Sequence, residues 1–215
     1  MSALARRFDA LELFAGSRLE GSRWSMTRTV IHASSAAASS GEMTMHYTRA
    51  AEASFLPLGK VADVGTARNN NNSGTWLSYF EKGTLFLSKQ SSREADVRLG
   101  DFTRRYLYHV LGPRTVDVYF DERQESSSAG NNQEESSHSS YADEPGIRFF
   151  HRLDFMGDRP ITAEATHLCG KDIYNVAFSA ANLSAQSAMR IRWKVKGPAK
   201  DYVMTSQYTP LFSEQ

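Results

Sequence analysis

The sequence predicts an all-β protein: a single antiparallel up-and-down β-barrel of about ten strands, preceded by a short N-terminal α-helix. Apolar and polar residues alternate with period two in many segments, which is typical of strands with one buried face. Residues 189–196 alternate almost without a break, with Met189, Ile191, Trp193 and Val195 on one face and Arg190, Arg192, Lys194 and Lys196 on the other. Short turns join the segments and no strand–helix alternation occurs, so a closed meander is favoured over a two-sheet sandwich.

The length and charge of the chain narrow its class. Its 215 residues fit one all-β domain over residues 1–215. The formal net charge is only +1, so the chain lacks the general electrostatic attraction to nucleic acids and anionic membranes. No apolar run approaches the roughly 20 residues that cross a bilayer. We therefore expect neither nucleic acid nor a membrane as a partner.

The single cysteine, Cys169, cannot form a disulfide within the chain, which favours a reducing compartment. Arg6 and Arg7 are soon followed by Asp9 and Glu12, and acidic residues are unusual in a transit peptide. We expect a soluble cytoplasmic protein, with mitochondrial import as the minor alternative.

The first expected element is a helix over residues 2–16. Leu4, Phe8 and Leu11 recur at helical spacing, Phe14 is a further candidate for the same stripe, and Gly16 is a natural C-terminal stop. Amphipathic helices usually bury their apolar stripe against their own protein. We therefore interpret this helix as a plug at one mouth of the barrel rather than as a membrane or partner helix.

Strand-like segments follow to the end of the chain. They span residues 22–33, 41–48, 51–57, 75–87, 96–111, 115–121, 147–156, 161–169, 171–180, 190–196 and 201–210. Two polar stretches interrupt them, 65–74 with its run of asparagines and 124–146 with its many serines and glutamates. Neither has enough apolar side chain to offset its ordering entropy, so we expect both to be surface loop inserts.

Several strings of the sequence resemble those of a known family. They are Tyr79-Phe-Glu-Lys-Gly83, Arg105-Tyr-Leu-Tyr108, Val118-Tyr-Phe-Asp-Glu, Phe150-His151, His167-Leu-Cys-Gly-Lys-Asp-Ile-Tyr174 and Trp193-Lys-Val-Lys-Gly-Pro-Ala-Lys-Asp-Tyr202. The chain resembles an uncharacterised calycin-like (lipocalin-like) barrel family, domain of unknown function 6314, over most of its length outside the polar inserts and the first residues. This resemblance implies a fold and no established activity.

Two histidines are candidates to face the barrel lumen. In residues 147–156 the apolar face would carry Ile147, Phe149, Leu153 and Phe155, and His151 falls among them. In residues 161–169 His167 shares a face with Ala163, Ala165 and Cys169, and such small neighbours leave space in front of an imidazole.

Asp172 and Tyr174 follow the next turn and share a face, close to His167 on the neighbouring strand. A polar cluster of this kind has three interpretations, which the sequence leaves open. It can orient a bound ligand. It can carry protons, with His151 or His167 as the proton carrier, Tyr174 or Tyr202 as donor, and Asp172 fixing the imidazole tautomer. It can also be a satisfied hydrogen-bond network in a filled core.

Three charged residues extend the list of lumen candidates. Arg28 and Arg104 lie on apolar faces of their strands, and Glu81 lies on the same face as Tyr79. Because an unpaired buried charge is strongly destabilising, we favour internal pairing of an arginine with Glu81. An arginine left over would instead favour an acidic ligand.

Metal and cofactor signals are weak. The chain has no Cys-x-x-Cys-His string, no His-x-x-x-His string and no clustered cysteines, so neither haem attachment nor a metal site is predicted, although His151, His167 and Asp172 could still converge in space. Residues i and i+2 of a strand lie about 7 Å apart. Cys169 is therefore interpreted as a small buried hydrophobe beside His167, and not as a nucleophile. The cofactor stays unknown.

Two further features have a structural and a functional interpretation. Trp193 is expected to pack the barrel floor rather than to stack on a ligand. The outward stripe of Arg190, Arg192, Lys194 and Lys196 is either a solvated face or a docking site for an acidic protein partner.

Together these features predict an intracellular barrel that holds a small, partly apolar ligand, with an acidic group as an option. One alternative is an enzyme that uses the His/Asp/Tyr cluster for acid–base chemistry. The other is a protein-interaction module with a filled core. No catalytic residue is assigned. The candidate ligand-binding residues are His151, His167, Asp172, Tyr174, Arg28, Arg104, Glu81 and Tyr202.

Overall fold

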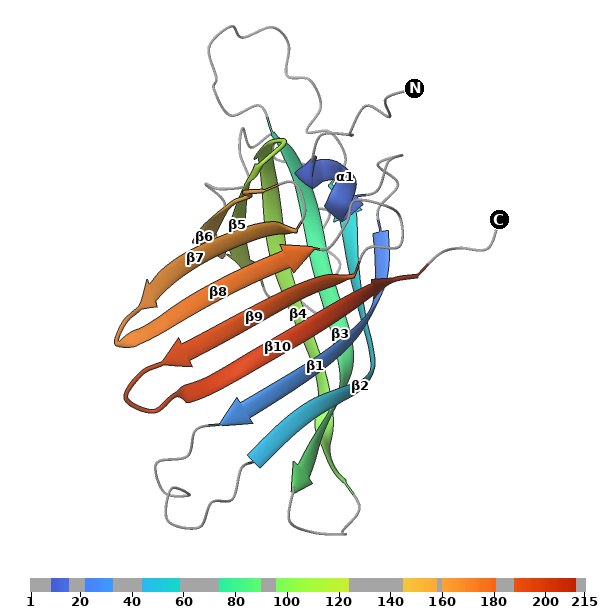
Figure 1. The fold of residues 1–215 in the computed structure, drawn as a ribbon, viewed down its shortest axis with the longest axis vertical. Coiled ribbons are helices and arrows are strands. Elements are labelled where there is room, and N and C mark those ends of the chain that lie inside the picture. The colour runs from blue at the N-terminus through green and yellow to red at the C-terminus, as the bar shows by residue number, and fades with distance from the viewer. Residues whose placement is uncertain are drawn as a thin grey trace, which may run out of the picture.

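The computed structural model describes residues 9–15, 22–32, 44–58, 74–89, 96–123, 145–157, 160–180 and 188–211. A short helix, α1 (Ala10–Ala15), precedes a single antiparallel sheet of ten strands (Figure 1). The strands are β1 (Ser22–His32), β2 (Thr44–Pro57), β3 (Thr75–Lys89), β4 (Val97–Gly112), β5 (Thr115–Asp121), β6 (Ile147–Asp154), β7 (Ile161–Cys169), β8 (Asp172–Ala180), β9 (Met189–Lys196) and β10 (Asp201–Pro210).

The strand order is that of a meander, β6-β5-β4-β3-β2-β1-β10-β9-β8-β7, in which β1 also pairs with β10. The prediction of an all-β antiparallel fold is thereby confirmed. Most predicted strand limits agree with the structure within two residues, because one face of each strand is apolar and the other polar.

The closure of the barrel differs from the prediction. The edge strands β6 and β7 are joined, within the described residues, by one bridge between Met156 and Thr162, with N···O distances of 2.8 and 3.0 Å. Elsewhere along this edge side chains make the contact, since the Phe150 ring lies 4.8 Å from the His167 ring. The molecule is thus a strongly curved sheet rather than a barrel closed by a continuous backbone ladder.

Two β-bulges, in β2 and β6, explain where the alternation of apolar and polar residues predicts the strands incorrectly. The segments expected at 41–48 and 51–57 form one strand, β2, whose pairing with β3 shifts between Arg49 and Glu52. A bulge gives one strand an extra residue and bends it, so the break in alternation looked like the end of a strand.

The second bulge reverses the prediction for Phe149. The register between β5 and β6 shifts so that Val118 pairs with His151 and Tyr119 pairs with Phe149, leaving Phe150 between them. Phe150 is therefore buried with 4% exposure, while Phe149 points outward with 49% exposure. His151 stays on the inner face, as predicted.

Ile147 also lies on the outer face and not on the predicted inner one. It belongs to a small cluster with Trp76, Leu107 and Tyr119. These residues alternate along their strands with residues of the main core, so the two clusters lie on opposite sides of the sheet.

Helix α1 fills one end of the curved sheet (Figure 1), as the plug interpretation predicts. Asp9 accepts a hydrogen bond from the Leu11 amide at 2.9 Å and acts as the N-cap. Phe14 is fully buried, and its ring contacts the rings of Phe55, Tyr108, Phe155 and Phe178. The other predicted helical residues, 2–8 and 16, lie outside the described residues, as do 65–73 and 124–144 of the polar inserts.

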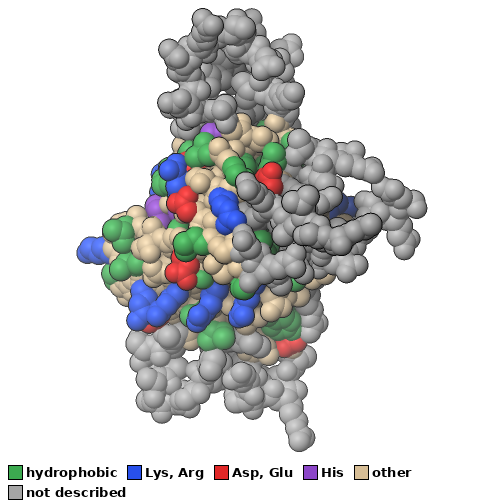
Figure 2. Space-filling model, turned by 45° about the horizontal axis from the view of Figure 1, so that its top comes forward, with side chains coloured by type: hydrophobic (Ala, Val, Ile, Leu, Met, Phe, Trp, Pro, Cys, Tyr) green, Lys and Arg blue, Asp and Glu red, His purple; other side chains and the backbone are tan. Residues whose placement is uncertain are grey.

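The outer face of β9 carries the predicted basic stripe. Arg190, Arg192, Lys194 and Lys196 are all exposed. Figure 2 shows several Lys and Arg side chains gathered in a row on one face of the molecule. The described part of the chain contains no helix long and apolar enough to span a bilayer.

Candidate functional site

A cavity of about 290 Å³ lies inside the curved sheet. The side chains that line it come from β1, β3, β4, β5, β6, β7, β8, β9 and β10. Every predicted site residue lines it except Asp172. The cavity is mainly aromatic, with polar groups at a few places, which is the usual make-up of a small-molecule site.

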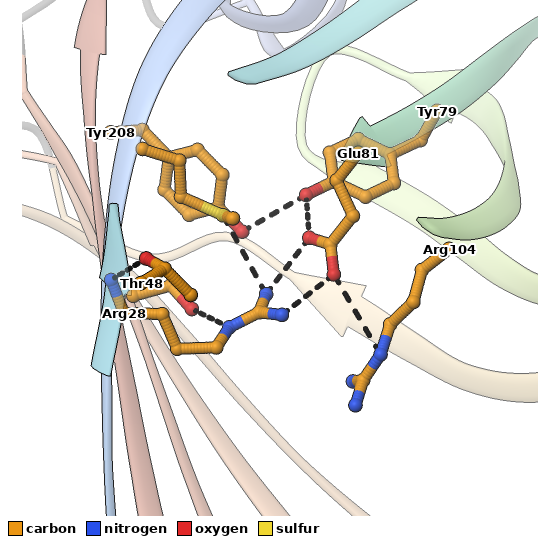
Figure 3. Close-up of polar contacts among 8 residues, drawn as sticks. Arg28, Thr48, Tyr79, Glu81, Arg104 and Tyr208 are labelled. Carbon is orange, nitrogen blue, oxygen red and sulfur yellow. Dashed lines mark hydrogen bonds and ion pairs between the residues drawn. The ribbon is translucent and has the colours of Figure 1, made fainter. Parts of the chain in front are cut away.

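A buried ion pair forms one wall of the cavity. Arg28 on β1 donates two hydrogen bonds to the two carboxylate oxygens of Glu81 on β3, at 2.7 and 2.8 Å (Figure 3). The side chains are only 7% and 1% exposed. Burial alone would lower the pKa of Arg28, but attraction and hydrogen bonding to Glu81 outweigh it and raise that pKa above its ordinary value. Arg28 is therefore paired within the protein, with Glu81.

Further hydrogen bonds fix both partners of this pair. The Arg28 Nε donates to the Ser206 hydroxyl at 2.9 Å, and the Arg28 amide donates to the Thr48 hydroxyl at 2.8 Å. The Tyr79 hydroxyl donates to Glu81 and lies 3.1 Å from the Tyr208 hydroxyl (Figure 3). Burial raises the pKa of Tyr79 and of Tyr208, with a further contribution from Glu81. Both phenols therefore stay protonated and can donate.

Arg104 on β4 is held much less tightly. Its Nε lies 3.8 Å from Glu81 Oε1, and its side chain is 47% exposed. The Tyr106 hydroxyl is a further polar neighbour. In Figure 3 the terminal guanidinium nitrogens of Arg104 point away from Glu81. Arg104 is thus a cation at the cavity wall whose guanidinium is open to a further partner.

His151 and His167 form the second polar part of the cavity. Within the described residues, the His151 Nδ1 and the His167 Nε2 are buried without a hydrogen-bond partner. Burial, with a contribution from His167, lowers the pKa of His151 to about 3, against an opposing effect of Asp117. His151 is therefore a neutral imidazole at neutral pH. A buried polar nitrogen without a partner is destabilising, and a ligand group could supply the missing hydrogen bond.

Aromatic rings fill the space around the two imidazoles. The Trp193 and Phe150 rings are stacked, with centroids 5.2 Å apart and planes inclined by 9°. The His151 ring meets Trp193 edge-on at 5.3 Å. The sequence predicts that Trp193 packs the barrel floor. The structure places it at the cavity wall.

Asp172 does not join this group. Its carboxylate pairs with the Lys200 ammonium at 2.6 Å, and Lys200 also donates to the Tyr174 hydroxyl at 2.8 Å. Asp172 is the first residue of β8, and the turn between β9 and β10 brings Lys200 over it. The carboxylate predicted to fix the imidazole tautomer of His151 or His167 is therefore paired with Lys200 at the rim.

The described residues contain no group of three or more His, Cys, Asp or Glu side chains in reach of one metal ion. Cys169 lines the cavity as a free thiol beside His167. Tyr202 lines it as well, and burial raises the pKa of its phenol.

Sequence reasoning missed part of the cavity wall. Simple alternation places Phe150 outside the barrel, although the string Phe150-His151 is one of the family-like motifs. Tyr79 and Tyr208 were not chosen, although their alternation with Glu81 and Ser206 places each on the same inner face as its polar neighbour. Both are nearly fully buried and hydrogen-bonded to each other.

The chain belongs to the family of unknown function DUF6314, whose model matches residues 19–210. This finding confirms the family that the sequence motifs resemble. No curated protein matches the sequence. Among solved structures, the S-type phycobiliprotein lyase CPES from Guillardia theta is similar at a TM-score of 0.43 and 6% sequence identity, covering 90% of this chain and 88% of that chain. A likeness at this level says nothing about function.

Proposed function

We propose that this protein binds a small, partly apolar molecule in the cavity of its curved sheet. The observation that carries the proposal is an aromatic cavity in which two buried imidazole nitrogens, of His151 and His167, have no hydrogen-bond partner within the described residues. A filled and satisfied core would have paired both nitrogens.

The size of the cavity supports the same function. Its volume of about 290 Å³ is close to the lower limit of the roughly 300–1,000 Å³ typical of small-molecule sites. The stacked rings of Trp193 and Phe150 offer a flat apolar surface, which favours a ligand with a flat apolar part. A module with a filled core has less support, because this space would then be occupied by side chains.

The acid–base enzyme also has less support. A histidine acts as a general base best when its pKa lies near the working pH, and the pKa of His151 is lowered to about 3. The carboxylate of Asp172, expected to assist His151 or His167, is paired with Lys200 instead. Binding without chemistry needs neither group.

Titration with N-phenylnaphthylamine, a neutral probe whose fluorescence rises in apolar surroundings, tests the proposal. Cys169→Trp places a large ring in the cavity, whereas Leu168→Trp places the same ring on the outer face, where Leu168 is 70% exposed. We expect wild type and Leu168→Trp to bind one probe per chain. Cys169→Trp should bind at least about tenfold more weakly, since the added ring occupies the space in which the probe would bury its apolar surface.

Equal affinities of the two variants would place the probe outside the cavity and contradict the proposal. Absence of binding to the wild type would contradict it as well. Far-ultraviolet circular dichroism shows whether each variant keeps the sheet.

A further inference from the structure

The charges that line the cavity do not balance. Apart from its histidines, the described lining contains three charged side chains, those of Arg28, Glu81 and Arg104. Two cations therefore face one anion, and the cavity wall carries one excess positive charge. A positively charged wall attracts an anion that enters the cavity.

The excess charge belongs to Arg104. Both Glu81 oxygens accept hydrogen bonds from Arg28, and one of them also accepts a hydrogen bond from the Tyr79 hydroxyl. Arg104 approaches Glu81 only to 3.8 Å, beyond the usual length of an N–H···O hydrogen bond. The carboxylate thus stabilises Arg28 first and leaves the Arg104 guanidinium largely uncompensated.

We propose that the ligand is an organic anion whose acidic group binds the Arg104 guanidinium while its apolar body lies along the aromatic wall. This inference rests on the proposed function and names the chemical class of the ligand. A guanidinium suits a carboxylate, sulfonate or phosphate because its N–H groups form a planar fork. The partnerless nitrogens of His151 and His167 then offer a second, uncharged contact to a polar atom of the body.

The nearby hydroxyl of Tyr106 fits this arrangement. Burial raises the pKa of Tyr106, so its phenol stays protonated and can donate to the same acidic group. Tyr202 also lines the cavity, and it lies near enough to Arg104 for the guanidinium charge to oppose the rise that burial causes in the pKa of its phenol. An acidic group at Arg104 would therefore meet neutral donors. The only carboxylate in the described lining is that of Glu81, which is already paired with Arg28.

Two probes with the same ring skeleton test this inference. Anilinonaphthalene sulfonate is anionic, and N-phenylnaphthylamine lacks the sulfonate. We expect the wild type to bind the anionic probe about tenfold or more tightly than the neutral one, the gain of a hydrogen bond to a charged group. Arg104→Gln should bring the ratio to about one. Arg192→Gln, an exposed arginine on the outer face of β9, should leave the ratio unchanged.

Arg104→Lys retains the charge and should keep most of the preference, which separates loss of charge from loss of fold. Equal affinities of the two probes for the wild type would overturn the inference and leave the proposed function standing. An unchanged ratio in Arg104→Gln would overturn it in the same way. Failure of both probes to bind the wild type would overturn the proposed function itself.

Discussion

The Arg28 guanidinium and the Glu81 carboxylate meet across the concave face of the sheet, although β2 separates their strands. Strands β1 and β3 lie about two spacings of 4.8 Å apart, a span that these two long side chains can bridge. The pair thus ties together strands that share no backbone hydrogen bonds. Both charges are withdrawn from water, so each depends on the other.

Removing one partner of this pair should destabilise the fold strongly. Glu81→Leu leaves the Arg28 charge buried without its carboxylate, and we expect the free energy of unfolding to fall by about 3–5 kcal/mol. Urea denaturation followed by circular dichroism measures this change. The double variant Arg28→Met/Glu81→Leu should recover most of the loss, and Glu52→Gln, in an exposed pair with Arg23, should show no measurable change. Equal losses in the single and double variants would disagree with this account.

The bulge in β6 predicts opposite behaviour for neighbouring phenylalanines. Phe150→Ala should destabilise the protein by about 3–5 kcal/mol, because a buried ring is lost and a cavity remains. Phe149→Ala should change stability by less than about 1 kcal/mol, since half of that side chain is exposed. The same denaturation experiment checks both variants. A larger loss for Phe149→Ala would show that β6 pairs without the bulge.

His151 predicts a specific dependence of stability on pH. Its pKa in the folded protein is about 3, compared with an ordinary value of 6.5. Between these values the unfolded chain binds more protons than the folded protein, so stability is full above about pH 6.5 and falls as the pH is lowered toward 3. His151→Gln lacks this titration.

The free energies of unfolding of wild type and His151→Gln, measured between pH 7 and 4, test that expectation. As the pH falls from 7 to 4, the wild type should lose a few kcal/mol more of its free energy of unfolding than His151→Gln does. Burial of the imidazole is the main cause of the shift, with His167 adding to it and Asp117 opposing it. A difference that stays constant with pH would mean that water reaches His151.

The sequence alone predicts most of the architecture and less of the site. Alternation locates the strands because burial of one face repeats every second residue, as in β9. It fails at the bulges of β2 and β6, where an extra residue shifts the faces and no turn residue marks the change. Glu81 could be matched with an arginine from the sequence, but the choice of Arg28 over Arg104 depends on the curvature of the sheet.

Asp172 shows a second limit of sequence reasoning. Its position in the alternation is inward, but a residue at the start of a strand lies at the rim, where the partner is set by a neighbouring turn. Lys200, in the turn between β9 and β10, pairs with this carboxylate. The pairing joins residues that alternation along a single strand cannot relate.

The turn that carries Lys200 predicts a further substitution effect. A Cβ atom at Gly197 would lie 1.8 Å from an oxygen of Asp172, so Asp172 would have to move away from its present position. We expect Gly197→Ala to lower the free energy of unfolding by about 1–2 kcal/mol, as overpacking does. Gly112→Ala is the matched control, because no atom lies within 4 Å of its Cβ position and stability should be nearly unchanged. Thermal unfolding compares the two, and equal effects would contradict the contact.

A crystal structure of the protein with anilinonaphthalene sulfonate would show whether the cavity holds an organic anion at Arg104. We predict the probe in the cavity, with its rings against Phe150 and Trp193 and its sulfonate at the Arg104 guanidinium. A probe bound on the outer face of the sheet, beside Trp76 or Tyr119, with the cavity unoccupied, would contradict the claim.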